Sequence, residues 1–421
     1  MTRMFRYIKS FGLVVVSVGL VLAILLGSVV PVKAAEPEER VVKIAFHAAF
    51  TGPLATVGVP LGSSTVDSIR YRNAHGGING VEVECLWEET RMEVPRCITA
   101  HKRFREAGVV AELIFEATPT ETLTPRMQRD EIPLLYFTGA TPEMVTEPIA
   151  WVFTADSGVV SLTTALLEWL KEQWTEERIP RIGMIFFDTG IAWDMRDAVK
   201  RCAPDYGAEF VGYEVVPLLG TLDTSTEWLR LAAKRPDWVI YVVTGSSGVT
   251  TMKDAARLDI QGKGIKLYAT AYALDEAIIR ATGEEAAEGW YVFGWFLYNN
   301  NVDMSLPAMR PMIEAVKQYR GWGQEKISGY YTAGWIMTLV AMEGIRLAIE
   351  KVGYADLTGR AVRDGLVRIN DFETGLVPPI TMTEERPFFM NYIRMYLVQQ
   401  GKIVPITDWR ELTYFEVGAS S

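Results

Sequence analysis

A chain of 421 residues is too long for one hydrophobic core, so two domains are expected. Its net charge of −10 at pH 7 becomes −14 once the four cations that precede Glu36 are left out, namely Arg3, Arg6, Lys9 and Lys33. A charge this negative argues against proteins that bind nucleic acid or anionic lipid surfaces.

The first 35 residues have the layout of a secretory signal peptide. Cations in residues 3–9 precede an apolar run from Phe11 to Val30, and the small residues Ala34 and Ala35 suit a signal peptidase. Because the apolar run approaches the roughly 20 residues that span a bilayer, an uncleaved membrane anchor is the alternative. We expect a periplasmic or otherwise extracytoplasmic protein, with a membrane-anchored form if the segment is retained.

From residue 41 onward, short apolar runs alternate with longer amphipathic segments. The first block predicts strands at 41–46, 81–86, 109–115 and 132–137, and helices at 62–73, 98–107 and 120–129. The second block predicts strands at 181–187, 209–215, 238–243 and 265–270, and helices at 193–206, 226–234 and 247–258. The chain continues with helices at 307–319 and 331–351 and closes with a hairpin of 391–399 and 402–406 around Gln400-Gly401. This alternation predicts an α/β fold with two similar parallel-sheet lobes covered by helices.

The chain has three cysteines: Cys85, Cys97 and Cys202. In an oxidising compartment this odd count permits one disulfide and one remaining thiol. Cys85 and Cys97 are close in sequence and are expected to pair; the alternative is three buried free thiols, since cysteine packs like a small apolar residue. Their spacing does not suit a zinc site, and neither a metal nor another cofactor is expected.

Four short segments then occur in an order typical of one family. They read AAFTGPLA at 48–55, HGGING at 75–80, IPLLYFTGATPE at 132–143 and EAAEG at 285–289. Together they resemble the type I periplasmic solute-binding proteins, the leucine/isoleucine/valine-binding family of ABC transporters. The resemblance implies two Rossmann-like lobes, joined by hinge crossings, with the ligand in a cleft between them.

The resemblance also implies how the chain is divided between the lobes. Residues 36–154 and 296–376 would form the N-terminal lobe, and residues 155–295 and 377–421 would form the C-terminal lobe. The crossings are expected near 153–157, 294–299 and 375–379.

Position by position, the resemblance places ligand-binding groups on the first lobe at Thr118, Gly139 and Thr141. Thr118-Pro119-Thr120-Glu121 is also a capping box, and Thr141-Pro142-Glu143 likewise begins a helix. Free N–H groups at a helix N-terminus suit an anion such as a ligand carboxylate. The alternative is that both threonines are ordinary helix caps without a ligand.

On the second lobe the sequence departs from the amino acid-binding pattern. Tyr272 stands where the family has an acid that pairs with the ligand's ammonium group, although Asp275 is close by. Trp193 is expected to supply an aromatic surface and Thr244 stands in place of a family tyrosine, while Tyr330 approaches the ligand from the first lobe. An unpaired buried ammonium is costly, so we expect a carboxylate, an amide or an aromatic acid rather than a simple branched-chain amino acid.

These features predict a receptor that closes on a small molecule and passes it to the membrane permease of an ABC importer. An enzyme is disfavoured, because His47, His75 and His101 have no serine or cysteine beside them in a nucleophile context and no phosphate-binding glycine loop is present. A second alternative is a sensor of the same fold that signals through a membrane partner.

Overall fold

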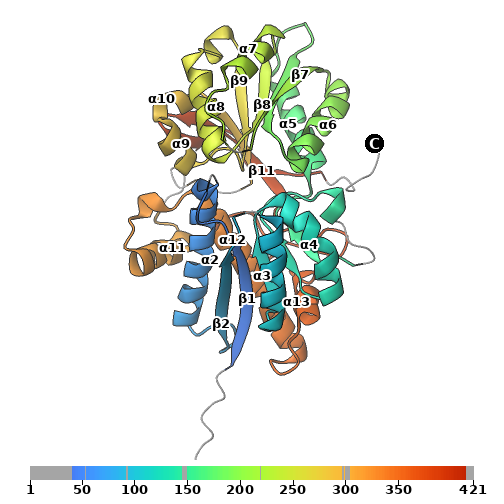
Figure 1. Cartoon of the computed structure of the whole chain (residues 1–421), viewed down its shortest axis with the longest axis vertical. Coiled ribbons are helices and arrows are strands. Elements are labelled where there is room, and N and C mark those ends of the chain that lie inside the picture. Colours follow the sequence, from blue (N-terminus) through green and yellow to red (C-terminus); the bar gives the residue numbers. More distant parts are fainter. Residues whose placement is uncertain are drawn as a thin grey trace, which may run out of the picture. The chain divides into compact units, whose positions relative to one another are not determined.

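The computed structural model describes residues 40–413, apart from residues 53, 92, 145–148, 219, 296, 297 and 299–303. The expected signal peptide, residues 1–35, therefore lies outside the described residues. Two α/β sheets account for the strands of the described chain, and Figure 1 shows them in two separate halves with helices on both sides of each.

The first sheet has five parallel strands in the order β2-β1-β3-β4-β5. Its strands are β1 (Val41–Ala48), β2 (Glu82–Glu89), β3 (Ala111–Ile114), β4 (Leu134–Tyr136) and β5 (Val152–Thr154). The helices that connect them are α2 (Ala55–Ala74), α3 (Val94–Glu106) and α4 (Ala117–Asp130). Each strand and helix predicted in this block is present, so the α/β fold class is confirmed here.

The second sheet has a parallel part in the order β10-β9-β8-β6-β7, and β11 and β12 extend it in antiparallel fashion. Its strands are β6 (Arg181–Phe187), β7 (Glu209–Val216), β8 (Trp238–Val242), β9 (Lys266–Thr270), β10 (Tyr291–Gly294), β11 (Tyr392–Gln399), β12 (Lys402–Pro405) and β13 (Arg410–Glu411), which pairs with β11. Its helices are α5 (Val159–Gln173), α6 (Gly190–Cys202), α7 (Ser225–Ala233), α8 (Gly245–Arg257), α9 (Glu276–Thr282) and α10 (Glu284–Ala287).

The predicted C-terminal hairpin is confirmed as β11 and β12. Gln400 and Gly401 join them with φ angles of 53° and 71°. Positive φ at both central residues is the requirement of a type I′ turn, whose twist matches that of the flanking strands.

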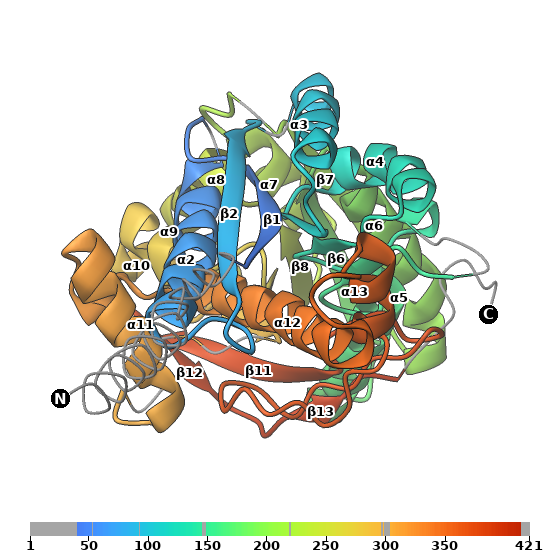
Figure 2. The same cartoon turned by 90° about the horizontal axis from the view of Figure 1, so that it is seen from below.

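Three helices from the later part of the chain pack beside the first sheet. They are α11 (Arg310–Ala315), α12 (Gly329–Val352) and α13 (Gly359–Leu366). Helix α12 packs on both α2 and α13, and Figure 2 shows the three together. By length and composition α12 could cross a membrane, but most of its residues are buried in the core, as in the central helix of a globular domain.

The chain passes from the first sheet to the second after β5. There the Thr154 and Ala155 carbonyl oxygens accept hydrogen bonds from the N–H groups of Phe389 (3.0 Å) and Met390 (2.6 Å), so two connecting segments run side by side. The stretch 375–379, where a crossing was expected, instead lies in a turn closed by a bridge between Phe372 and Ile380. The chain therefore enters the second sheet later than expected. The expected crossing at 294–299 falls largely outside the described residues, and the residue ranges of the two lobes stay a prediction.

The two faces of the first sheet carry separate cores, and this explains why the expected disulfide is absent. Cys85 on β2 packs with the core beneath α2 and α12, whereas Cys97 on α3 is buried in the core beneath α3 and α4. All three cysteines are free thiols, so the prediction of a Cys85–Cys97 disulfide is wrong in this structure. A side chain cannot reach through a sheet to a partner on its other face.

The core beneath α3 contains a buried chain of ionisable groups. Glu112 on β3 accepts hydrogen bonds from His47 Nε2 and His101 Nδ1, both at 2.8 Å, and His101 Nε2 lies 3.0 Å from Asp130 Oδ2. Both ring nitrogens of His101 face carboxylates, an arrangement that favours the protonated ring. Burial acts to lower the pKa of His101, but the bonds to Glu112 and Asp130 outweigh it and the pKa is raised. His101 is thus a buried core residue.

Strand β2 forms one edge of the first sheet. It carries the acidic side chains Glu82, Glu84, Glu88 and Glu89 in eight residues, and its inner positions such as Val83 are buried. Two of these acids pair across the surface: Glu88 with Arg103 at 2.8 Å and Glu84 with Lys43 at 4.0 Å.

Candidate functional site

A cavity of about 130 Å³ is lined by loops that follow strands of both sheets. From the first sheet come the segments after β3 and β4 together with the start of α2; from the second come segments after β6, β7, β8 and β9. Every one of these strands is parallel to its neighbours, so the cavity lies where open α/β sheets place their ligands, beyond the carboxyl ends of the strands. Its wall consists of Leu54, Val57, Phe115, Glu116, Ala117, Thr118, Pro119, Tyr136, Phe137, Thr138, Phe187, Thr189, Ile191, Leu218, Thr244 and Tyr272.

Three of the predicted site residues line this cavity: Thr118, Thr244 and Tyr272. Thr118 lies in the first turn of α4, and the other two follow β8 and β9. The cavity thus brings together residues from the two halves of the chain that the sequence assigned to opposite sides of the ligand.

Thr118 is placed differently from the prediction in one respect. Helix α4 begins at Ala117 with Glu116 at the N-cap, and no side chain caps it. Thr118 is therefore inside the helix, and the expected capping box with Glu121 is wrong. The carboxylate of Glu121 does not bond back to Thr118, since its Oε1 accepts a hydrogen bond from Thr141 Oγ1 at 3.3 Å.

Gly139 and Thr141 lie behind the wall rather than in it. A Cβ atom at Gly139 would fall 2.1 Å from Asp156 Oδ1, so glycine permits the segment after β4 to pack against the connection from β5 to α5. Thr141 is buried and precedes a 3₁₀ turn at Pro142–Met144, where its carbonyl accepts from the N–H of Met144. Both residues thus follow the wall residues Phe137 and Thr138 in the chain without lining the cavity.

Trp193 and Tyr330 are also outside the wall. Trp193 Nε1 donates to Asp188 Oδ1 at 2.7 Å, and its ring packs edge-on against Phe186. Tyr330 is fully buried at the start of α12, where its hydroxyl donates to the Tyr272 carbonyl at 3.0 Å and lies 3.5 Å from Thr244 Oγ1. Tyr330 therefore positions two wall residues that belong to the second sheet.

Asp275, the alternative partner for a ligand ammonium, is used by the fold. Its Oδ1 accepts from the N–H groups of Ala277 (2.8 Å) and Ile278 (3.0 Å) and so caps α9, and its Oδ2 accepts from the N–H of Tyr330 at 3.4 Å. A carboxylate with these bonds is an N-cap and does not line the cavity.

Sequence reasoning missed Glu116, the one acid among the described residues of the wall. Its side chain is fully buried, and no side chain of the described residues forms a hydrogen bond with either carboxyl oxygen; only the backbone N–H groups of Phe115 and Glu116 lie near enough to lower its pKa. Burial raises the pKa of Glu116 to about 8, and the nearby acid Glu89 adds to this rise. A signal was available, since an acid lies two residues after the end of the fully buried strand β3.

Three hydroxyl groups of the wall share this lack of partners among the described residues. They belong to Thr138, Thr189 and Tyr272, and each oxygen is buried. Buried polar groups are nearly always hydrogen-bonded in folded proteins. A cluster of four unsatisfied groups around one cavity therefore indicates a site prepared for polar groups of a ligand.

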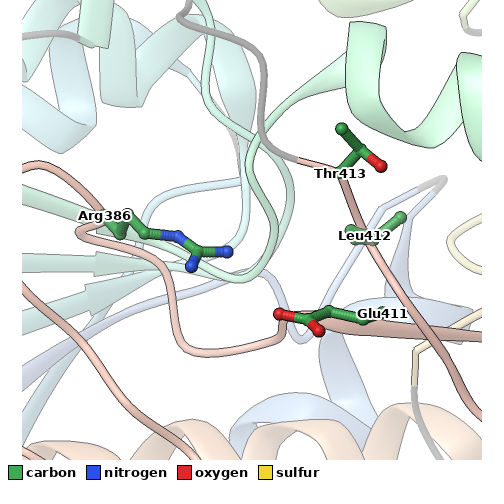
Figure 3. A pocket seen from close by; sticks show the side chains of 4 residues that line it. All are labelled: Arg386, Glu411, Leu412 and Thr413. Atoms are coloured by element: carbon green, nitrogen blue, oxygen red, sulfur yellow. The ribbon is translucent and has the colours of Figure 1, made fainter.

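A second, wider pocket of about 320 Å³ lies elsewhere on the chain. It is lined by Arg386, Glu411, Leu412 and Thr413, and Figure 3 shows the side chains of Arg386 and Glu411 directed toward the same space. None of the predicted site residues lines it.

Comparison with known proteins agrees with this architecture. The profile of a family described as "Periplasmic binding protein" matches residues 41–402. No curated protein sequence matches the chain.

Solved structures of the same fold are numerous. A branched-chain amino acid ABC transporter protein from Thermus thermophilus with bound valine is 21% identical, with a TM-score of 0.78 over 89% of this chain and 97% of that one. An ABC transporter substrate-binding protein from Aeropyrum pernix is 18% identical, with a TM-score of 0.76 over 90% and 100%. A solute-binding protein from R. palustris in complex with 4-hydroxybenzoate is 14% identical, with a TM-score of 0.73 over 90% and 99%. With a family profile that spans most of its length and the fold of these receptors, this chain belongs to the type I periplasmic binding proteins.

Proposed function

We propose that this protein is an extracytoplasmic receptor that captures a small amino acid-like, amide or carboxylate solute and delivers it to the membrane permease of an ABC importer. The observation that carries the proposal is the cavity at the carboxyl ends of strands from both sheets, in which four buried polar groups lack protein partners. The family and its ABC-transporter neighbours support the same reading.

Binding proceeds by closure of two surfaces on the solute. The solute first contacts the first-sheet residues Thr118 and Thr138, and the second-sheet residues Thr244 and Tyr272 then cover it. The start of α12 connects the two sides, because Glu276 Oε2 accepts from the N–H of Gly329 at 2.7 Å. A solute that contacts both sides favours the closed form by the difference between its affinities for the two forms.

A thermal-shift screen of the purified chain against small metabolites tests this function. The panel holds branched-chain amino acids, amides, short carboxylates and aromatic acids, and a ligand at about 100 times its Kd adds about 2.7 kcal/mol to stability. The shift should shrink in Thr118→Val, which loses a cavity hydroxyl, and persist in Thr122→Val, one turn further along α4 and outside the wall. A chain that no solute in the panel stabilises would contradict the proposal.

A further inference from the structure

The cavity wall has a marked charge asymmetry. Among the described residues, it contains the carboxyl group of Glu116 and the phenols of Tyr136 and Tyr272, but no lysine, arginine or histidine. An anionic solute would find no cation to pair with in this wall. Burial of an unpaired charge is costly, so the groups already present decide which charge the cavity accepts.

The surroundings of Glu116 add no positive charge. The titratable groups that act on it, or on which it acts, are Glu89 of β2, Cys97 of α3 and Tyr136 of β4. Burial raises its pKa to about 8, with a further rise from the Glu89 charge, against the opposing effect of the backbone N–H groups of Glu116 and Phe115, so the neutral carboxylic acid prevails in the empty site near pH 7. No side chain of the described residues forms a hydrogen bond with either oxygen.

The rest of the wall suits a compact apolar body. Aromatic rings of Phe115, Tyr136, Phe137, Phe187 and Tyr272 line it, and such rings attract cations over their faces. Its volume of about 130 Å³ is close to that of an engineered apolar cavity of about 150 Å³ that takes up benzene.

We propose that Glu116 is the specificity-determining residue of this cavity and selects a small solute that carries a cationic nitrogen, an ammonium or amidinium group, on a compact apolar body. This inference rests on the receptor function proposed above; of the ligand classes named there it keeps the solutes with a cationic nitrogen, adds amidines, and sets the neutral amides and simple carboxylates aside. The nitrogen donates to Glu116, while the free hydroxyls of Thr138, Thr189 and Tyr272 serve the remaining polar atoms of the solute. Tyr272 stands after β9 where the family has an acid, and Glu116, which follows a strand of the first sheet, takes over the role of that acid.

Binding of a cation changes the protonation of the site. The O–H bond of the Glu116 carboxylic acid breaks, its proton passes to solvent, and the carboxylate pairs with the incoming nitrogen, so the net charge of the closed site is zero. At pH 7 a group of pKa about 8 gives up about 0.9 proton per solute bound. Between pH 6 and pH 7 the affinity rises about ninefold, and it levels off above pH 8.

The test uses isothermal titration calorimetry on the full chain with benzamidine, benzamide and benzoate, which share a ring and differ in charge. Titrations in two buffers of different ionisation enthalpy give the number of protons released. We expect benzamidine to bind most tightly, with proton release. Glu116→Gln should weaken benzamidine binding by roughly thirtyfold or more, abolish proton release and leave benzamide binding within a few-fold.

A matched control is Glu121→Gln on the same helix, which removes an acid that does not line the cavity and should leave benzamidine binding and proton release unchanged. Tighter binding of benzoate, or benzamidine binding that Glu116→Gln does not weaken, overturns this inference but leaves the receptor function standing. Failure of every cation, with binding of a short carboxylate or an aromatic acid in the metabolite panel, has the same meaning. Failure of every solute counts against both proposals.

Discussion

Replacing Tyr272 with phenylalanine should change stability and solute binding in opposite directions. The hydroxyl oxygen of Tyr272 is buried at the cavity, and no described residue forms a hydrogen bond with it. An unsatisfied buried polar group costs about 1–3 kcal/mol. Tyr272→Phe should therefore raise the free energy of unfolding of the empty protein by about 1 kcal/mol.

The same change should weaken the binding of a solute. A hydrogen bond of ordinary strength contributes about 0.5–1.5 kcal/mol, which corresponds to an affinity about two- to tenfold lower once it is lost. Tyr241→Phe is the matched control, because the Tyr241 hydroxyl is equally buried but donates to the Gly248 carbonyl at 2.8 Å. It should lower the free energy of unfolding by about 1 kcal/mol and leave solute affinity unchanged.

Urea unfolding of the empty variants measures the first effect, and calorimetric titration with the solute that gives the largest thermal shift measures the second. If Tyr272→Phe destabilised the empty protein as much as Tyr241→Phe does, its hydroxyl would have a partner in the empty protein. The assignment of that hydroxyl to the ligand would then be refuted.

Three further changes are predicted. His101→Gln should lower the free energy of unfolding by about 3 kcal/mol at pH 6, since it breaks a buried ionic network, and by less at pH 9. The sign follows from the raised pKa of His101: its contribution is complete below the unfolded pKa and is lost as the pH rises through the folded one, which urea titrations at the two pH values would reveal. Gly139→Ala should lower the free energy of unfolding by about 1–3 kcal/mol, because the added Cβ would collide with Asp156. An unchanged midpoint of urea unfolding would contradict that packing. Glu116→Gln should raise the free energy of unfolding of the empty protein more at pH 9 than at pH 5. The reason is that the raised pKa of Glu116 makes ionisation of its carboxyl group unfavourable to folding. Equal effects at the two pH values in urea unfolding would show that burial does not raise this pKa.

The sequence predicted the architecture well because both sheets are built from regular patterns. Alternating apolar runs identified the strands, and the Gln400-Gly401 turn identified the final hairpin. The start of α2 was predicted seven residues too late, and the missed part contains Gly58 and Pro60. In the structure a Cβ at Gly58 would fall 2.0 Å from the Ala49 carbonyl oxygen, so this glycine allows the helix to lie against the end of β1.

The site was predicted at the level of loops more accurately than at the level of side chains. The strand ends that carry it follow from sheet topology, which the periodicity of the sequence determines. Which side chain at each end points to the cavity depends on local packing: Thr118, Thr244 and Tyr272 line the wall, while Trp193 turns to bond with Asp188. The role of Glu116 depends on the absence of a partner in three dimensions, which one sequence cannot reveal.

The acidic edge of the first sheet has a consequence for the protein in a crowded compartment. Strand β2 is an edge strand, and such edges template aggregation. The side chain of Asn73 covers part of this edge, since it bonds both the N–H and the carbonyl of Val83. A second copy that added its own β2 would bring its acidic side chains close to those of the first. Like charges that face each other across paired strands repel, so the edge discourages self-assembly and keeps separate copies apart.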